Sequence, residues 1–133
     1  MKNLCFLLLV LSAFSCKKTS IYDNSLIYVR YHNDTGLDLK DLTVINADSS
    51  TVLISSNLKD GKQSDYFSKE GYTLYDGLPI EHLHGFDSNG NSLDINYLGF
   101  CGVGIVIEEL EPGLHTMRLY KPSNSDYIWM ELE

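Results

Sequence analysis

Apolar and polar residues alternate with the two-residue period of β-strands in the first part of the chain after residue 25. Residues 26–32 and 37–45 are rich in β-branched and aromatic side chains, and a strong turn signal at 33–36 separates them. The apolar alternation shifts between Leu39 and Leu42, as a β-bulge would cause. The pattern therefore predicts two strands, the second of which contains a bulge.

A hairpin is the clearest signal in the middle of the chain. Residues 80–86 and 93–97 alternate, and the segment 87–91 between them contains Asn-Gly, whose two residues both tolerate positive φ. A short strand is expected at 51–54. The segment 58–79 is interrupted by glycines and predicts one or two short strands joined by long loops.

The last third of the chain predicts further strands. Residues 100–107 are nearly all apolar, which is typical of a central strand buried on both faces. A Glu-Pro-Gly turn at 111–113 leads into a strand at 114–120, and 127–132 forms a terminal strand. No stretch shows a sustained 3.6-residue apolar period with caps, so we expect little helix.

Seven to nine short strands separated by frequent turns indicate an all-β fold, a single antiparallel β-sandwich at residues 26–133. A small β-barrel is the alternative. The segment 112–116 resembles the proline-glycine turn that begins a late strand in many bacterial immunoglobulin-like and transthyretin-like modules. That resemblance implies an immunoglobulin-like sandwich.

The N-terminus has the order of a secretory signal peptide: Lys2, an apolar run at 4–11, and small residues up to Ser15. The apolar run is shorter than the roughly 20 residues that a spanning helix needs. The junction of Ser15 with Cys16 resembles the lipobox of bacterial lipoprotein signal peptides. The resemblance implies that residues 1–15 are removed and that Cys16 carries palmitate-type acyl chains.

The same junction has a rival interpretation. Ala13 and Phe14 stand where the lipobox usually has leucine and a small residue, and Ala13-x-Ser15 also suits an ordinary signal peptidase. The product would then be a secreted protein without lipid. In the lipoprotein interpretation, residues 16–25 form a tether. Lys17 and Lys18 occupy the place where Gram-negative lipoprotein families signal inner-membrane retention with an acidic residue, which implies an outer-membrane protein facing the periplasm or the cell surface.

Size and charge limit the classes of partner. Without the signal, 118 of the 133 residues remain, enough for one hydrophobic core. Removing Lys2 with the signal lowers the formal charge from −8 to −9. This balance argues against nucleic acid and against broad contact with anionic lipid headgroups, because both require a basic surface.

The histidines and cysteines offer candidates for chemistry. His82 and His84 project from one strand face, where His115 or Asp87 would complete a metal site. Cys101 has no disulfide partner once Cys5 and Cys16 are accounted for, and activation of its thiolate by His84 or His115 would make it a nucleophile. We instead expect ordinary strand positions for the histidines and a buried, inert cysteine. No metal or cofactor is predicted.

Aromatic residues are the candidates for binding. If Ile128, Met130 and Leu132 face the core, then Tyr127 and Trp129 face away from it, where two flat rings can stack on sugar rings or on an apolar patch of a partner. On glycine-punctuated loops, three further rings would add to such a site: Tyr66, Tyr72 and Tyr75. The alternative is that all these rings pack under loops or against the second sheet.

These features favour a non-enzymatic, membrane-tethered module of the cell envelope that binds or supports another envelope protein or a glycan. The motifs of serine hydrolases, zinc proteases and phosphate-binding loops do not occur in the sequence. One alternative is a small enzyme or metal-dependent accessory that uses the His82/His84 pair, His115 or Cys101. Another is an inhibitor of a periplasmic hydrolase.

Overall fold

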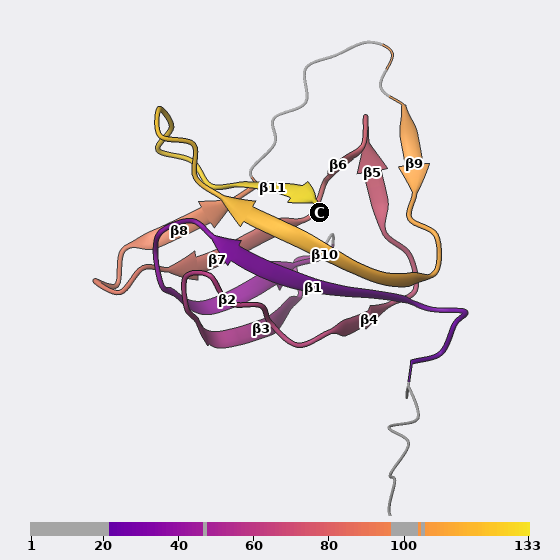
Figure 1. The fold of residues 1–133 in the computed structure, drawn as a ribbon, viewed down its shortest axis with the longest axis horizontal. Coiled ribbons are helices and arrows are strands. Elements are labelled where there is room, and N and C mark those ends of the chain that lie inside the picture. Colours follow the sequence, from indigo (N-terminus) through magenta and orange to yellow (C-terminus); the bar gives the residue numbers. More distant parts are fainter. Residues whose placement is uncertain (1–21, 47, 97–103, 105) are drawn as a thin grey trace, which may run out of the picture.

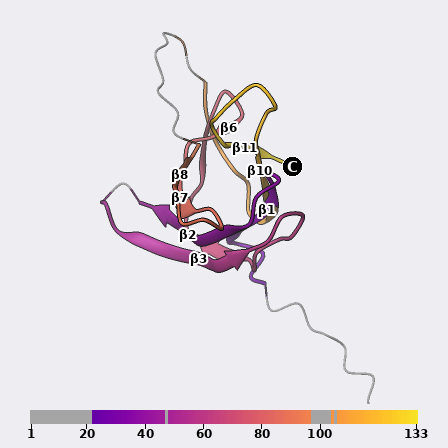
Figure 2. The ribbon, with the colours of Figure 1, turned by 90° about the vertical axis from the view of Figure 1, so that its left-hand side faces the viewer.

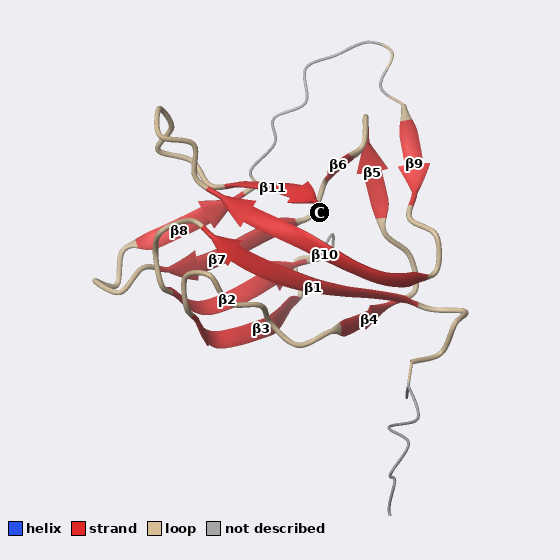
Figure 3. Cartoon of the chain, in the orientation of Figure 1, coloured by secondary structure: helices blue, strands red, loops and turns tan. Residues whose placement is uncertain are grey.

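The chain is all-β. The computed structural model describes residues 22–46, 48–96, 104 and 106–133, and within these ranges every regular element is a strand (Figure 3). The strands are β1 (Ile27–Asp34), β2 (Leu39–Ile45), β3 (Thr51–Leu58), β4 (Phe67–Lys69), β5 (Thr73–Tyr75), β6 (Leu78–Pro79), β7 (His82–Phe86), β8 (Ser92–Ile95), β9 (Ile107–Glu109), β10 (Gly113–Tyr120) and β11 (Trp129–Leu132). In the same part of the chain, no helix is long and apolar enough to cross a membrane.

The strands form three sheets with the orders β11-β10-β1-β4, β3-β2-β7-β8 and β6-β5-β9 (Figure 1). The paired strands run antiparallel except for β1 and β10, which are parallel from Ile27 opposite Gly113 to Asp34 opposite Tyr120. The expectation of purely antiparallel pairing is wrong at this pair. The two strands come from opposite ends of the chain, so no tight turn forces them to run in opposite directions. The described sheets are open, so the small closed barrel does not form.

One hydrophobic core contains residues of both four-stranded sheets. Along β1, buried and half-buried residues alternate, as the period of two requires. Figure 2, turned by 90°, shows β2 and β3 along the lower edge of the molecule and β10 and β11 above them. Fully buried core residues come from both sheets: Val29, Tyr31, Met117 and Leu119 from the first, and Leu39, Leu42, Leu83 and Ile95 from the second.

The bulge and the hairpin expected from the sequence are both present. The register of β2 against β3 shifts between Leu42 and Thr43, next to Asp41, whose φ is +48°. In the β7–β8 turn, the Asp87 carboxylate accepts hydrogen bonds from the backbone N–H groups of Asn89 and Asn91 at 2.8 and 2.9 Å. Local sequence signals are therefore sufficient to define these two features.

Two segments differ from expectation. Residues 58–79 contain three short strands, β4, β5 and β6, rather than one or two. Of the apolar run 100–107, residues 100–103 and 105 lie outside the described residues, while Val106 and Ile107 are 54% and 65% exposed. The described end of this run is therefore not buried on both faces. Ile107 is the first residue of β9, which is the end strand of the smallest sheet and pairs with β5.

A buried polar cluster connects the sheets. The carboxylate of Glu81, between β6 and β7, accepts hydrogen bonds from the hydroxyl of Tyr31 on β1 and from Lys69 on β4. The hydroxyl of Tyr72 donates to the same carboxylate at 3.3 Å. Burial, and then the negative charge of Glu81, raise the pKa of both tyrosines above the ordinary value.

Candidate functional site

The end strands of the two larger sheets meet at the site. Ile95 on β8 forms an isolated parallel bridge with Ile128, the residue before β11. The backbone N–H of Asn96 donates to the carbonyl oxygen of Ile128 at 2.9 Å. Both isoleucines are buried, at 0% and 3% exposed. This junction places Asp94, next to Ile95, beside Tyr127 and Trp129, which flank Ile128.

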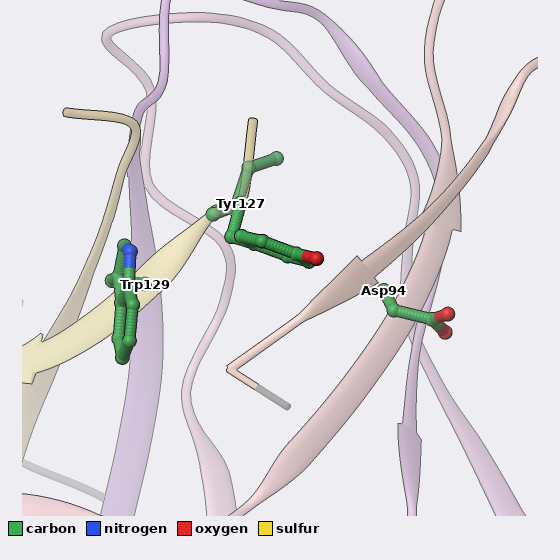
Figure 4. Close-up of a pocket in the computed structure, with 4 residues that line it drawn as sticks. Asp94, Tyr127 and Trp129 are labelled. Atoms are coloured by element: carbon green, nitrogen blue, oxygen red, sulfur yellow. The ribbon is translucent and has the colours of Figure 1, made fainter. Parts of the chain in front are cut away.

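A small pocket lies at this junction, and we call it the Tyr127 pocket. Its volume is about 260 Å³, and its lining among the described residues is Asp94, Tyr127, Ile128 and Trp129. Figure 4 shows the ring of Tyr127 extending toward the strand that carries Asp94, with the indole of Trp129 on the other side. Tyr127 is 68% exposed and Trp129 36%. Two exposed aromatic residues and one acidic residue therefore line the same small pocket, and the carboxylate of Asp94 is directed away from the rings.

A larger pocket of about 500 Å³ shares Trp129 as part of its lining, and we call it the Asn96 pocket. Its other lining residues among those described are Leu78, Asn96, Tyr120, Pro122, Asn124, Ser125 and Met130. Asn124 and Ser125 lie in the connection between β10 and β11. Trp129 thus contributes to two adjoining hollows.

The alternation argument for the terminal strand is correct at four of its residues. Ile128 and Met130 are buried, at 3% and 2% exposed, and Tyr127 and Trp129 are exposed. Leu132 was expected in the core but is 38% exposed. It is the last residue of β11, where the sheet ends.

The other three tyrosines lie away from these pockets. Tyr72 is 6% exposed and its hydroxyl is engaged with Glu81, so it lies in the core rather than on a binding surface. Tyr75 is half-buried on β5. Tyr66 packs against Arg30, whose guanidinium lies 4.8 Å from the ring centre. None of the three lines either pocket in the part of the chain that the structure describes.

The candidate metal ligands are dispersed. His82 Nε2 lies 3.5 Å from Asp94 Oδ1, whereas His84 Nε2 lies 2.9 Å from Ser92 Oγ. His115 contacts the carbonyl oxygen of Glu111 at 2.8 Å, and Asp87 is engaged in the hairpin turn. Across the described ranges, no group of three or more His, Cys, Asp or Glu side chains is arranged to hold a metal ion. Cys16 and Cys101 lie outside the described residues.

Sequence reasoning missed Asp94 and Asn96. Both are adjacent to Ile95, and only the bridge to Ile128 brings them to the aromatic residues. The alternation along 93–97 did carry a partial signal, because it separates Asp94 and Asn96 from the apolar residues of that strand. It contains no information about which distant segment they meet.

Comparisons with known proteins give no family for this chain. No family model matches it, and no curated protein matches it. The NMR structure of a protein from Eubacterium rectale aligns with a TM-score of 0.49 at 15% identity, covering 81% of this chain and 88% of that one. A likeness at this level defines neither a family nor an activity.

Proposed function

We propose that this protein is a non-enzymatic, membrane-tethered module of the bacterial cell envelope that binds a neutral glycan through Tyr127, Trp129 and Asp94. The observation that carries the proposal is one pocket, at the junction of two sheets, that is lined by two exposed aromatic residues and Asp94. Sugar rings present apolar C–H faces, which stack on aromatic rings, and hydroxyl groups, which donate hydrogen bonds to carboxylates.

The exposure of the rings supports a binding role. Tyr127 is 68% exposed, so most of its ring contributes nothing to the hydrophobic core and remains in contact with water until a ligand covers it. The carboxylate of Asp94 is also accessible, with 62% of its side chain exposed. The formal charge of −8 disfavours an acidic ligand.

The fold and the cellular location belong to the same proposal. We assign the two four-stranded sheets to an immunoglobulin-like sandwich, and their shared hydrophobic core supports this assignment. The order of Lys2, the apolar run 4–11 and the junction of Ser15 with Cys16 supports an acylated Cys16 and attachment to the outer membrane.

The binding proposal is tested with Tyr127→Ala and Trp129→Ala, singly and together. The full-length protein, purified in detergent, is titrated calorimetrically with a panel of neutral oligosaccharides. Loss of one stacked ring is expected to weaken binding by about 0.5–1.5 kcal/mol. Leu114→Ala is the matched control, because Leu114 is 50% exposed and lies about 20 Å along β10 from Tyr120, the residue that pairs with Trp129. Unchanged affinity in the double variant contradicts the proposed site.

Attachment to the membrane is tested with Cys16→Ser. Cells grown with radiolabelled palmitate are expected to label the parent protein and not the variant, because the serine hydroxyl does not replace the thiol in the acylation. The variant is also expected to leave the membrane fraction. A labelled, membrane-bound Cys16→Ser protein would contradict the lipoprotein assignment.

A further inference from the structure

The Asn96 pocket extends the proposed binding site past Trp129. The same indole lines this pocket and the Tyr127 pocket, so a ligand stacked on Trp129 has a second hollow next to it. The Asn96 pocket is the larger of the two, at about 500 Å³ against about 260 Å³. A ligand that fills both must be longer than one sugar unit.

Asn96, which lines this second hollow, has an unused hydrogen-bond acceptor that lies beneath the surface. The residue is 2% exposed, and its φ of +57° is unusual for a residue with a side chain. Its Nδ2 donates to the carbonyl oxygens of Pro79 and Glu81 at 2.7 and 3.0 Å. Its Oδ1 is buried and has no hydrogen-bond partner among the described residues.

The identity of the unused atom follows from its neighbours. Both partners of Nδ2 are carbonyl oxygens, which accept hydrogen bonds and cannot donate them. Turning the amide over would therefore place an oxygen against two oxygens, and the orientation is fixed. Because nearly all buried polar atoms in proteins are paired, an unpaired acceptor on a residue that lines a pocket is a candidate partner for a donor from outside.

The remaining lining defines what kind of group carries this donor. Leu78, Pro122 and Met130 supply apolar contacts, and Asn124 and Ser125 supply polar ones. Tyr120 adds an aromatic ring with a hydroxyl group, and none of these side chains is charged. The group must therefore be neutral, with one N–H donor, one acceptor and a small apolar end. An acetamido group has all of these features.

We propose that the Asn96 pocket is a second subsite that takes the acetamido group of an N-acetylated amino sugar. The ligand is then an oligosaccharide of at least two units, with one ring on Trp129 and Tyr127. Since less than 1 Å² of Oδ1 is exposed, the side chains over it must shift when the acetamido N–H reaches it. This inference rests on the proposed function and adds the ligand class.

A matched pair of oligosaccharides tests the inference. The probes are the β-1,4-linked tetramer of glucose and the corresponding tetramer of N-acetylglucosamine, which differ only in the acetamido groups. Calorimetry on the full-length protein in detergent is expected to give at least about fivefold tighter binding of the acetylated tetramer, the effect of one added hydrogen bond. The side-chain amide resonances of Asn96 are expected to shift with the acetylated tetramer alone.

A variant that blocks the Asn96 pocket tests whether the preference for the acetylated tetramer arises there. Asn124→Trp places a large side chain at the exposed edge of the Asn96 pocket and is expected to bring the affinity ratio of the two tetramers close to one. Asn89→Trp, in the exposed β7–β8 turn, is the control and should keep the ratio of the parent. A ratio of one in the parent overturns the second subsite while leaving glycan binding intact. Failure of both tetramers to bind overturns the proposed function as well.

Discussion

Alkaline pH is expected to destabilise this protein steeply through Tyr31 and Tyr72. In the folded state, burial and the charge of Glu81 raise the pKa of both phenols. In the unfolded chain, both return to the ordinary tyrosine pKa of about 10. Their contribution to stability is therefore fully present below pH of about 10, and it is lost as the pH rises toward the folded-state pKa, because the unfolded chain releases protons that the folded protein retains.

The magnitude follows from the number of protons. Each retained proton lowers the free energy of unfolding by about 1.36 kcal/mol per pH unit, so two tyrosines give a slope of about 2.7 kcal/mol per pH unit. For a domain with a free energy of unfolding of about 5–15 kcal/mol, an increase of two pH units removes a large share of the stability.

Urea denaturation across a pH series measures this slope. The chain has one tryptophan, Trp129, whose fluorescence reports unfolding. Tyr72→Phe is expected to reduce the slope above pH of about 10 by half, and Tyr127→Phe is expected to leave it unchanged. The reasoning fails if the parent keeps its full stability one pH unit above a pH of about 10. It also fails if Tyr72→Phe and Tyr127→Phe have the same slope of stability against pH.

Two further predictions concern packing and the binding site. Gly85→Ala is expected to lower the free energy of unfolding by about 1–3 kcal/mol in a urea titration, because the new Cβ would lie 3.1 Å from the Lys40 carbonyl oxygen. Gly71→Ala, whose Cβ would have 3.8 Å to its nearest neighbour, is the control and should change stability by far less. Asp94→Asn is expected to weaken oligosaccharide binding about tenfold in calorimetry, because hydrogen bonds to a charged acceptor are worth about 1.5–3 kcal/mol. Equal affinity in Asp94→Asn would exclude the carboxylate as a hydrogen-bond acceptor for sugar hydroxyls.

The sequence predicts local features well and long-range pairing poorly. The bulge after Leu42 and the turn at Asp87 are encoded by residues close together in the chain, so the pattern identifies them. The parallel pairing of β1 with β10 joins the two ends of the chain, and no local period encodes it. The donors to Glu81 also come from two distant segments, Tyr31 from one and Lys69 and Tyr72 from the other, so their convergence becomes visible only in the folded structure.

The candidate site also combines features that the sequence predicts with features that only the folded structure shows. Alternation alone correctly separates the exposed Tyr127 and Trp129 from the buried Ile128. The carboxylate and the unpaired amide oxygen beside them depend on the Ile95–Ile128 bridge, which the sequence does not reveal. The sequence prediction is wrong for Tyr72. Its glycine-rich neighbourhood suggests an exposed loop, whereas the residue is buried and its hydroxyl donates a hydrogen bond to Glu81.

The parallel alignment of β1 with β10 has a mechanical consequence. Tension drawn through the N-terminal chain pulls on the first strand along its axis, and its eight residues are held against β10 in a single register. The strands must then slide past each other, so the ladder hydrogen bonds share the load instead of opening one after another. Because β11 pairs with β10, a pull on Trp129 reaches the N-terminal strand through two consecutive ladders. In the proposed function, this arrangement would resist tension between a ligand at Trp129 and the N-terminal attachment.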